Sequence, residues 1–157
     1  ITEKLGPAAD FRICKGIYLE PPEVAHTGYR EIVNAMNDCV DAMLDSGAYV
    51  GIATHDHPVI KHSLDALTAR GMGPDIPDPR NGAASERAGK GSGYEFQMLL
   101  GVRGNVRRRL KSRGHKTRVY LPYGDRWYEY SIRRLRENPD VAAHIARAFL
   151  MPWANRR

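Results

Sequence analysis

The alternation of short apolar runs with helical patterns constrains the fold of this chain more than any other feature of its sequence. Each run has the length of a strand and is mostly apolar, which is typical of strands in a buried parallel sheet. Four such runs lie at 11–19, 49–54, 94–102 and 117–121. Helical periodicity is clearest over Tyr29–Leu44, whose tyrosine and methionine stripe we expect to be a core face. This order predicts an α/β fold with a parallel sheet.

Further helices are expected over 58–70, 104–113, the segment after Asp125, and 140–150. Polar side chains gather within or just after each strand: Arg12, Lys15, Tyr18, Thr54, His55, Glu95, Gln97 and Tyr120. In (βα)8 barrels, active sites lie at the face where the strands end. Such barrels need about 250 residues, and this chain has 157. The four βα units therefore predict half of a TIM-like (βα)8 barrel.

The stretch Arg118–Asn138 combines a strand, a turn and a helix. Tyr130, Arg133, Arg134 and Glu137 are spaced so that they share one helix face. Paired guanidiniums beside a tyrosine suit a carboxylate, because arginine offers planar paired donors and stays charged. On this stretch alone, a solvated helix face is the simpler interpretation. The polar ends of the other strands favour a carboxylate clamp that covers a barrel mouth.

The charge of the chain raises a second class of function. The formal net charge is +6, and much of the excess lies in Arg103–Arg118. A nucleic-acid-binding module centred there is one alternative. Aromatic residues are not interleaved with these charges, however, so a solvated outer helix is favoured and no nucleic-acid partner is expected. No metal is expected either, because His55 and His57 are two residues apart and no third ligand is evident nearby.

Three further features bear on domain organisation. Gly71–Gly93 is rich in glycine and proline, which predicts a mobile loop. Cys14 and Cys39 show no metal or disulfide spacing, and we expect buried free thiols. The chain begins at Ile1 and not at Met, so we expect a piece of something longer. No apolar run approaches the length of a membrane span.

Four strand motifs and one helix motif resemble a known family. KGIYLEP, ATHD, EFQMLLG, and RVYLPYG followed by WYEYSIRRLREN look like the last four βα units of proline dehydrogenase, a flavin-dependent enzyme with a distorted (βα)8 barrel. The resemblance covers most of Phe11–Asn138 in order, and the pattern at Tyr130–Asn138 is its specific element. It implies that 1–157 is the C-terminal half of a single barrel domain plus a C-terminal helix.

The resemblance also implies roles for individual residues. Arg133 and Arg134 would bind the proline carboxylate, and Glu137 would hold their helix in place. The substrate pocket would be formed by Tyr18, Leu99, Tyr120 and Tyr130. Arg12 would lie near the flavin N5 edge. The remaining flavin contacts would come from Lys15, Gly16, Thr54 and His55.

The implied reaction is oxidation of L-proline to Δ1-pyrroline-5-carboxylate by hydride transfer to N5 of FAD. A membrane quinone or electron-transfer chain would reoxidise the flavin, so the protein would be cytoplasmic with peripheral contact at the inner face of a membrane. The missing N-terminal half of the barrel must come from elsewhere, and this chain alone is expected to be inactive. No second domain for aldehyde oxidation is evident, which implies a monofunctional enzyme. A (βα)8-barrel enzyme of different chemistry that clamps an anionic substrate is the other alternative.

Overall fold

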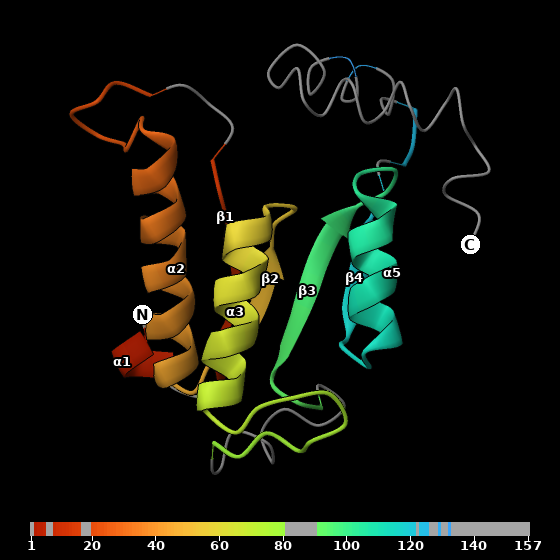
Figure 1. The fold of residues 1–157 in the computed structure, drawn as a ribbon. Coiled ribbons are helices and arrows are strands. Elements are labelled where there is room, and N and C mark those ends of the chain that lie inside the picture. Colours follow the sequence, from red (N-terminus) through yellow and green to blue (C-terminus); the bar gives the residue numbers. More distant parts are fainter. Residues whose placement is uncertain are drawn as a thin grey trace.

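The computed structural model describes residues 2–5, 8–16, 20–80, 91–121 and 123–125, together with positions 129 and 132. Its elements are α1 (Thr2–Leu5), β1 (Asp10–Cys14), α2 (Tyr29–Asp45), β2 (Tyr49–Ala53), α3 (His57–Ala69), β3 (Tyr94–Leu99), α5 (Gly104–Ser112) and β4 (Thr117–Tyr120) (Figure 1). The elements predicted between 29 and 121 are confirmed, with ends that differ by a few residues. The strand expected over 11–19 ends at Cys14, and 17–19 lie outside the described residues. The helix expected over 140–150 also lies outside the described residues, as does nearly all of the helix expected after Asp125.

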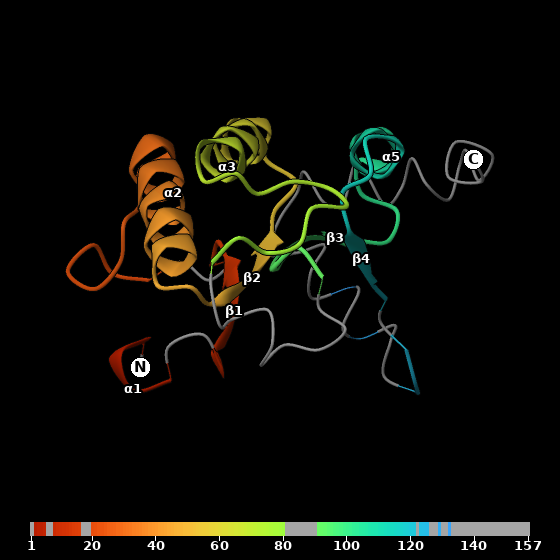
Figure 2. The ribbon, with the colours of Figure 1, turned by 90° about the horizontal axis from the view of Figure 1, so that it is seen from below.

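The four strands form one parallel sheet in the order β1-β2-β3-β4. The three long helices α2, α3 and α5 lie on the same face of this sheet (Figure 2). A doubly wound sheet reverses its strand order and carries helices on both faces, whereas a barrel wall has sequential strands with all helices outside. The predicted α/β class with a parallel sheet is confirmed, and the topology is consistent with part of a TIM-like barrel.

The core fills the space between the sheet and these helices. It contains, among others, Val40, Leu44, Val50, Ile52, Ile60, Leu67, Phe96, Met98, Val106 and Leu110. Val106 and Leu110 belong to α5, so the basic helix buries one apolar side and turns its charges outward. This arrangement confirms the predicted outer helix over 104–113. The apolar runs of β2 and β3 supply the buried strand residues of this core, whereas β1 and β4 are largely exposed.

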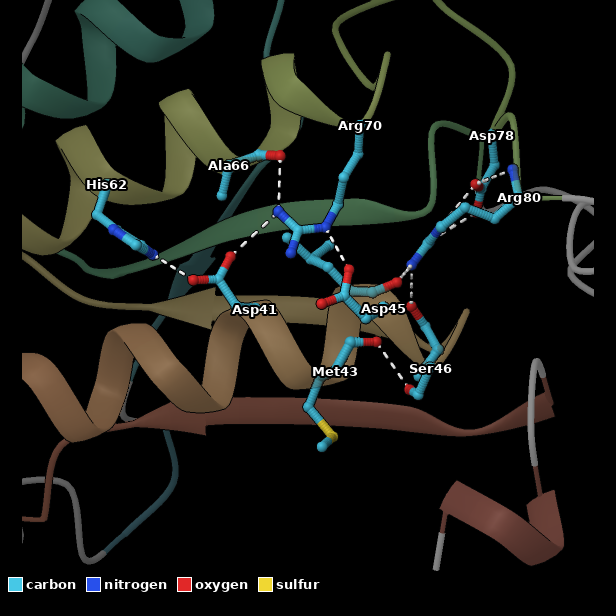
Figure 3. A network of polar contacts seen from close by, with 11 residues as sticks. Asp41, Met43, Asp45, Ser46, His62, Ala66, Arg70, Asp78 and Arg80 are labelled. Atoms are coloured by element: carbon cyan, nitrogen blue, oxygen red, sulfur yellow. Dashed lines mark hydrogen bonds and ion pairs between the residues drawn. The ribbon is translucent and has the colours of Figure 1, made fainter.

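Polar contacts fix the ends of α2 and α3 on the side where the strands begin. Arg70, just after α3, donates from Nε to Asp45 at 2.7 Å and pairs through Nη1 with Asp41 at 3.1 Å (Figure 3). Arg80 pairs with the buried Asp78 at 2.7 Å and donates to the backbone carbonyl of Leu44 at 3.0 Å. The first part of the segment 71–93 is therefore anchored against α2. The mobile loop over the whole segment stays a prediction, since 81–90 lie outside the described residues.

Three expectations about burial were wrong. Tyr29 is 59% exposed instead of lying in the core. It is the first residue of α2, and this helix begins near the edge where the parallel strands end, beyond the packed layer. Cys14 and Cys39 are exposed free thiols. Cys14 alternates with the core-facing Ile13, and Cys39 lies off the buried side of α2.

Candidate active site

The alternation of side chains along β3 separates the core from a polar surface. Tyr94, Phe96 and Met98 pack in the core beneath the helices. Because successive residues of a strand point to opposite faces, Glu95 and Gln97 lie on the other face of the sheet. In a barrel whose helices lie outside, the sheet face away from the helices is the interior. We name the group formed by Glu95, Gln97 and their partners the inner-face network.

Glu95 is the centre of the inner-face network. Its side chain is 2% exposed, yet it receives hydrogen bonds from three neighbouring strand residues. Tyr49 Oη donates to Oε2 at 2.9 Å, and Gln97 Nε2 donates to Oε1 at 2.8 Å. Arg118 donates to both oxygens, with its Nη2 3.0 Å from Oε2. The carboxylate is thus held by β2, β3 and β4 together.

These contacts keep Glu95 ionised. Burial alone would raise the pKa of Glu95, because it disfavours the charged form. The hydrogen bonds from Arg118, Gln97 and Tyr49 together outweigh burial, so the pKa lies below its ordinary value. The same environment raises the pKa of Tyr49, first through burial and then through its bond to Glu95. The centre of the network is therefore one negative charge surrounded by donors.

Gln97 connects this charge to Arg12. Its Oε1 accepts a hydrogen bond from Arg12 Nε at 2.9 Å, while its Nε2 points to Glu95. Gly51 lies between Arg12 and Glu95 in the strand register. A Cβ at Gly51 would come within 2.5 Å of Gln97 Nε2. Because Gly51 has no side chain, the Gln97 amide can occupy the space above it. A shallow hollow of about 210 Å³ lies beside this amide.

A second cluster lies where β1 and β2 end. Lys15 forms an ion pair with Asp56, and Tyr29 Oη donates to Asp56 Oδ1 at 2.9 Å. The Lys15 ammonium also lies 4.9 Å from the centroid of the Tyr29 ring, a cation–π contact. The Asp56 backbone N–H donates to Thr54 Oγ1 at 3.1 Å. Residues from the start of α2 and from the segments just after β1 and β2 thus meet at one point.

Asp56 is the N-cap residue of α3 but does not use its carboxylate as a cap. Aspartate at this position usually accepts a hydrogen bond from the first turn of its helix. Here the carboxylate binds Lys15 and Tyr29 instead. Burial alone would raise the pKa of Asp56, but the contacts from Lys15 and Tyr29 outweigh it, so the pKa lies below its ordinary value.

His55 joins the ends of β2 and β3. Its Nε2 accepts a hydrogen bond from the backbone N–H of Leu99 at 2.9 Å. Arg103, at the start of α5, donates from Nη1 to the carbonyl of His55 at 3.0 Å. The acceptor role of Nε2 leaves the proton on Nδ1 when the ring is neutral. The ends of three consecutive strands are therefore connected by direct contacts.

Comparison with known proteins identifies the family. The family model described as "Proline dehydrogenase" matches residues 8–147, most of the chain. The chain belongs to the proline dehydrogenase family.

Named relatives agree with this assignment. Proline dehydrogenase of Deinococcus radiodurans is 34% identical over 141 residues, which is 90% of this chain and 40% of the relative. Proline dehydrogenase 1 of Bacillus subtilis strain 168 is 31% identical and is covered over 41% of its length. Proline dehydrogenase 2 of the same strain is 33% identical over 138 residues. The chain therefore spans about 40% of the length of these relatives.

The structure brings together most of the described residues that the proline dehydrogenase resemblance selects for the cofactor. Lys15 and Thr54 both contact Asp56, and His55 contacts the strand end at Leu99. Arg12 lies on the inner face and is bound to Gln97. Gly16 follows β1, and a Cβ added there would meet no atom within 4 Å.

The pocket residues are described only in part. Leu99 and Tyr120 are partners in the register between β3 and β4, and Tyr120 is 47% exposed. The other five predicted residues of the proline dehydrogenase site lie outside the described residues: Tyr18, Tyr130, Arg133, Arg134 and Glu137. Their roles stay predictions.

Several residues of the candidate site were not selected from the sequence. Asp56 lies between His55 and His57, which were considered only for a metal, and Tyr29 was assigned to the core. Glu95 and Gln97 were counted among the polar side chains of the strands but were given no role. Their alternation with Tyr94, Phe96 and Met98 is the signal that could have identified a polar sheet face. Among the described residues, no group of three His, Cys, Asp or Glu side chains could hold a metal ion. No helix in this part of the chain is long and apolar enough to cross a membrane.

Proposed function

We propose that the complete protein oxidises L-proline to Δ1-pyrroline-5-carboxylate with FAD as the hydride acceptor. Membership of the proline dehydrogenase family supports this proposal, and so do relatives of that name at 31–34% identity. The observation that carries it is the edge at which β1, β2 and β3 end. There, Lys15 and Thr54 both contact Asp56, and the neighbouring His55 contacts the end of β3 at Leu99. All three residues were selected for cofactor binding.

The residues present fit a flavin nucleotide. FAD carries an anionic pyrophosphate, and Lys15 and Arg103 place positive charge at the strand ends, while Thr54 adds a hydroxyl group. Gly16 offers backbone without a side chain beside Lys15. When bound, FAD supplies the acceptor for the hydride that leaves the carbon next to the ring nitrogen. We assign Arg12, Lys15, Gly16, Thr54 and His55 to its binding.

The substrate side of the proposal rests on a carboxylate clamp. Arg133 and Arg134 would fix the carboxylate of proline, so that the far side of the ring meets the cofactor. Tyr18, Leu99, Tyr120 and Tyr130 would form the pocket, and Glu137 would hold the clamp helix. Most of the catalytic effect then comes from positioning, because a bound, oriented ring needs little further reorganisation.

The sheet described above would be the C-terminal half of a (βα)8 barrel closed by an N-terminal half that this chain does not contain. The reduced flavin would pass its electrons to a membrane quinone or an electron-transfer chain. The positive net charge of +6 is compatible with peripheral contact at an anionic membrane surface. The same assignment places the protein in the cytoplasm, on the inner side of that membrane.

Product analysis tests the proposed reaction. The complete protein should copurify with FAD and should convert L-proline into Δ1-pyrroline-5-carboxylate, which is trapped and identified by mass spectrometry. A protein that binds FAD but leaves L-proline unchanged would favour a (βα)8-barrel enzyme of different chemistry. A protein that takes up no FAD would overturn the proposal altogether.

Two variants test the clamp. Arg134→Met should raise KM for proline by roughly tenfold or more with FAD still bound, since one charge-assisted hydrogen bond contributes about 1.5–3 kcal/mol. Arg136 is on the same helix pattern but outside the predicted face, so Arg136→Met is the matched control and should change KM little. Steady-state kinetics give KM for proline in both variants, and their FAD content shows whether the cofactor stays bound. Loss of FAD with unchanged proline affinity would contradict the division between substrate and cofactor residues.

A further inference from the structure

The orientation of Arg12 in the inner-face network depends on how the amide of its partner Gln97 is oriented. Arg12 donates from Nε to Gln97 Oε1 at 2.9 Å. An amide side chain can present either its oxygen or its nitrogen, and only the oxygen can accept from a guanidinium. Whatever fixes the orientation of the Gln97 amide therefore fixes Arg12.

Glu95 supplies this constraint chemically. Its carboxylate is ionised and accepts only, so the group facing it at 2.8 Å must be the NH₂ of Gln97. The oxygen of the same amide is then turned towards Arg12. Arg118 holds Glu95 in place by donating to both of its oxygens, and burial leaves it almost no contact with solvent.

Gly51 supplies the constraint sterically. It lies between Arg12 and Glu95 in the register of β1, β2 and β3. Any Cβ at this position would approach Gln97 Nε2 to 2.5 Å and Gln97 Cδ to 3.1 Å, so the amide would have to move away from its present place. Glycine at this position thus leaves room for the Gln97 amide of β3 to reach Arg12 on β1.

We propose that Glu95 and Gly51 are positioning residues, which act through the amide of Gln97 to hold the Arg12 guanidinium in one orientation in the flavin site. This inference rests on the proposed function for the chemical role of Arg12, but the orientation itself is independent of any bound cofactor. An arginine held by one oriented acceptor presents its remaining N–H groups in a fixed direction, which is how a preorganised donor stabilises developing negative charge.

The direct test follows the Nε–H of Arg12 by NMR in the complete protein labelled with ¹⁵N-arginine. The signal is assigned by its loss in Arg12→Met. In the parent protein, hydrogen exchange of this group with water should be slow. It should become clearly faster in Glu95→Gln, which removes the charge that orients Gln97, and in Gly51→Ala, which displaces the amide.

Tyr49→Phe is the matched control. It also removes a hydrogen bond to Glu95, but on Oε2, away from Gln97. The exchange rate of Arg12 Nε–H should then stay as in the parent. Slow exchange in both Glu95→Gln and Gly51→Ala, or equal acceleration in Tyr49→Phe, would overturn the positioning role, whether or not the protein oxidises proline.

Kinetics give the second measurement. In Glu95→Gln and Gly51→Ala the rate constant of flavin reduction at saturating proline should fall by about tenfold, with little change in proline affinity, because a small misplacement near the reacting atoms lowers the rate without weakening binding. Neither change should lower this rate further when Arg12→Met is already present. Additive losses would show that the two residues act on the fold and not through Arg12. A protein with altered exchange but no proline oxidation would support the positioning role and overturn only the proposed function.

Discussion

At the scale of single residues, Lys15 shows how charge is placed where a strand ends. Asp56 pairs with its ammonium group, and the Tyr29 ring lies 4.9 Å from it. Asp56 leaves the first turn of α3 without a side-chain cap in order to make these contacts. A side-chain cap contributes about 1 kcal/mol to a helix. Asp56 therefore leaves α3 less stable than a capping aspartate would, and orients the Lys15 ammonium instead. Such an exchange is expected at binding sites.

Replacement of Lys15 tests its assignment to the cofactor. Lys15→Met should weaken FAD binding by about tenfold or more, since it removes a charge-assisted contact of roughly 1.5–3 kcal/mol. Lys61→Met is the control, because Lys61 forms a similar ion pair with Asp65 on the exposed side of α3. FAD occupancy after dialysis gives the comparison. Full occupancy in Lys15→Met would remove Lys15 from the site.

At the scale of elements, Arg80 connects its loop to the end of α2 and to the residues just before β2 and β3. It donates to the carbonyls of Leu44 at 3.0 Å, Ala48 at 2.9 Å and Gly93 at 3.2 Å, and pairs with Asp78. Asp78 is 1% exposed and Arg80 14% exposed. Four groups from three parts of the chain thus depend on one guanidinium.

Arg80→Met should lower the free energy of unfolding by about 3 kcal/mol, because it removes the guanidinium that pairs with the buried carboxylate of Asp78. Arg70→Met is the matched change. Arg70 also pairs with two carboxylates, but these are 32% and 65% exposed, so its loss should cost about 1 kcal/mol. Urea unfolding of the complete protein measures both. Equal losses in the two variants would contradict the importance of burial at Asp78.

The elements themselves were largely predictable from the sequence, and the site was predictable in part. The strands and helices between 29 and 121 agree with their expected ranges because their apolar residues form one core layer. The partners of Glu95 were not predictable, since Arg118 and Tyr49 are 23 and 46 positions away and meet it only in the sheet register. Tyr29 was wrongly assigned to the core, because helical periodicity predicts which side of a helix is buried. It does not predict how far the first turn of the helix extends beyond the core.

At the scale of the whole molecule, α2, α3 and α5 cover one face of the sheet, and the other face carries the polar inner-face network. Among the described residues, the apolar core lies on the covered face, while polar residues like those of the inner-face network are typical of a barrel interior. The chain spans about 40% of its named relatives. Each test of catalysis and binding therefore uses the complete protein.

The stability of the fold should depend on pH through His115. Its half-buried ring packs edge-on against Phe96 and contacts Tyr94 Oη through Nδ1 at 2.8 Å. Burial, and then the nearby Arg113, lower the pKa of His115 below its ordinary value of 6.5. The unfolded chain therefore binds a proton first, and stability should decrease as the pH falls below about 6.5.

Thermal unfolding between about pH 7.5 and about pH 5.5 measures this effect. His115→Asn keeps a polar partner for Tyr94 but cannot take up the proton, so its Tm should change less over the same range. Groups such as Glu95, whose pKa is lowered from 4.5, contribute only at more acidic pH. An equally steep change in His115→Asn would exclude His115 as the cause.

The central claim, a flavin reduced by proline, is tested most directly by anaerobic titration of the complete protein. L-proline should bleach the visible flavin absorption, and dithionite should then bleach little more, because the same flavin has already been reduced. Dithionite added alone to a second sample shows that the flavin can be reduced. A protein without flavin absorption, or one whose flavin is bleached by dithionite but not by L-proline, would contradict the account.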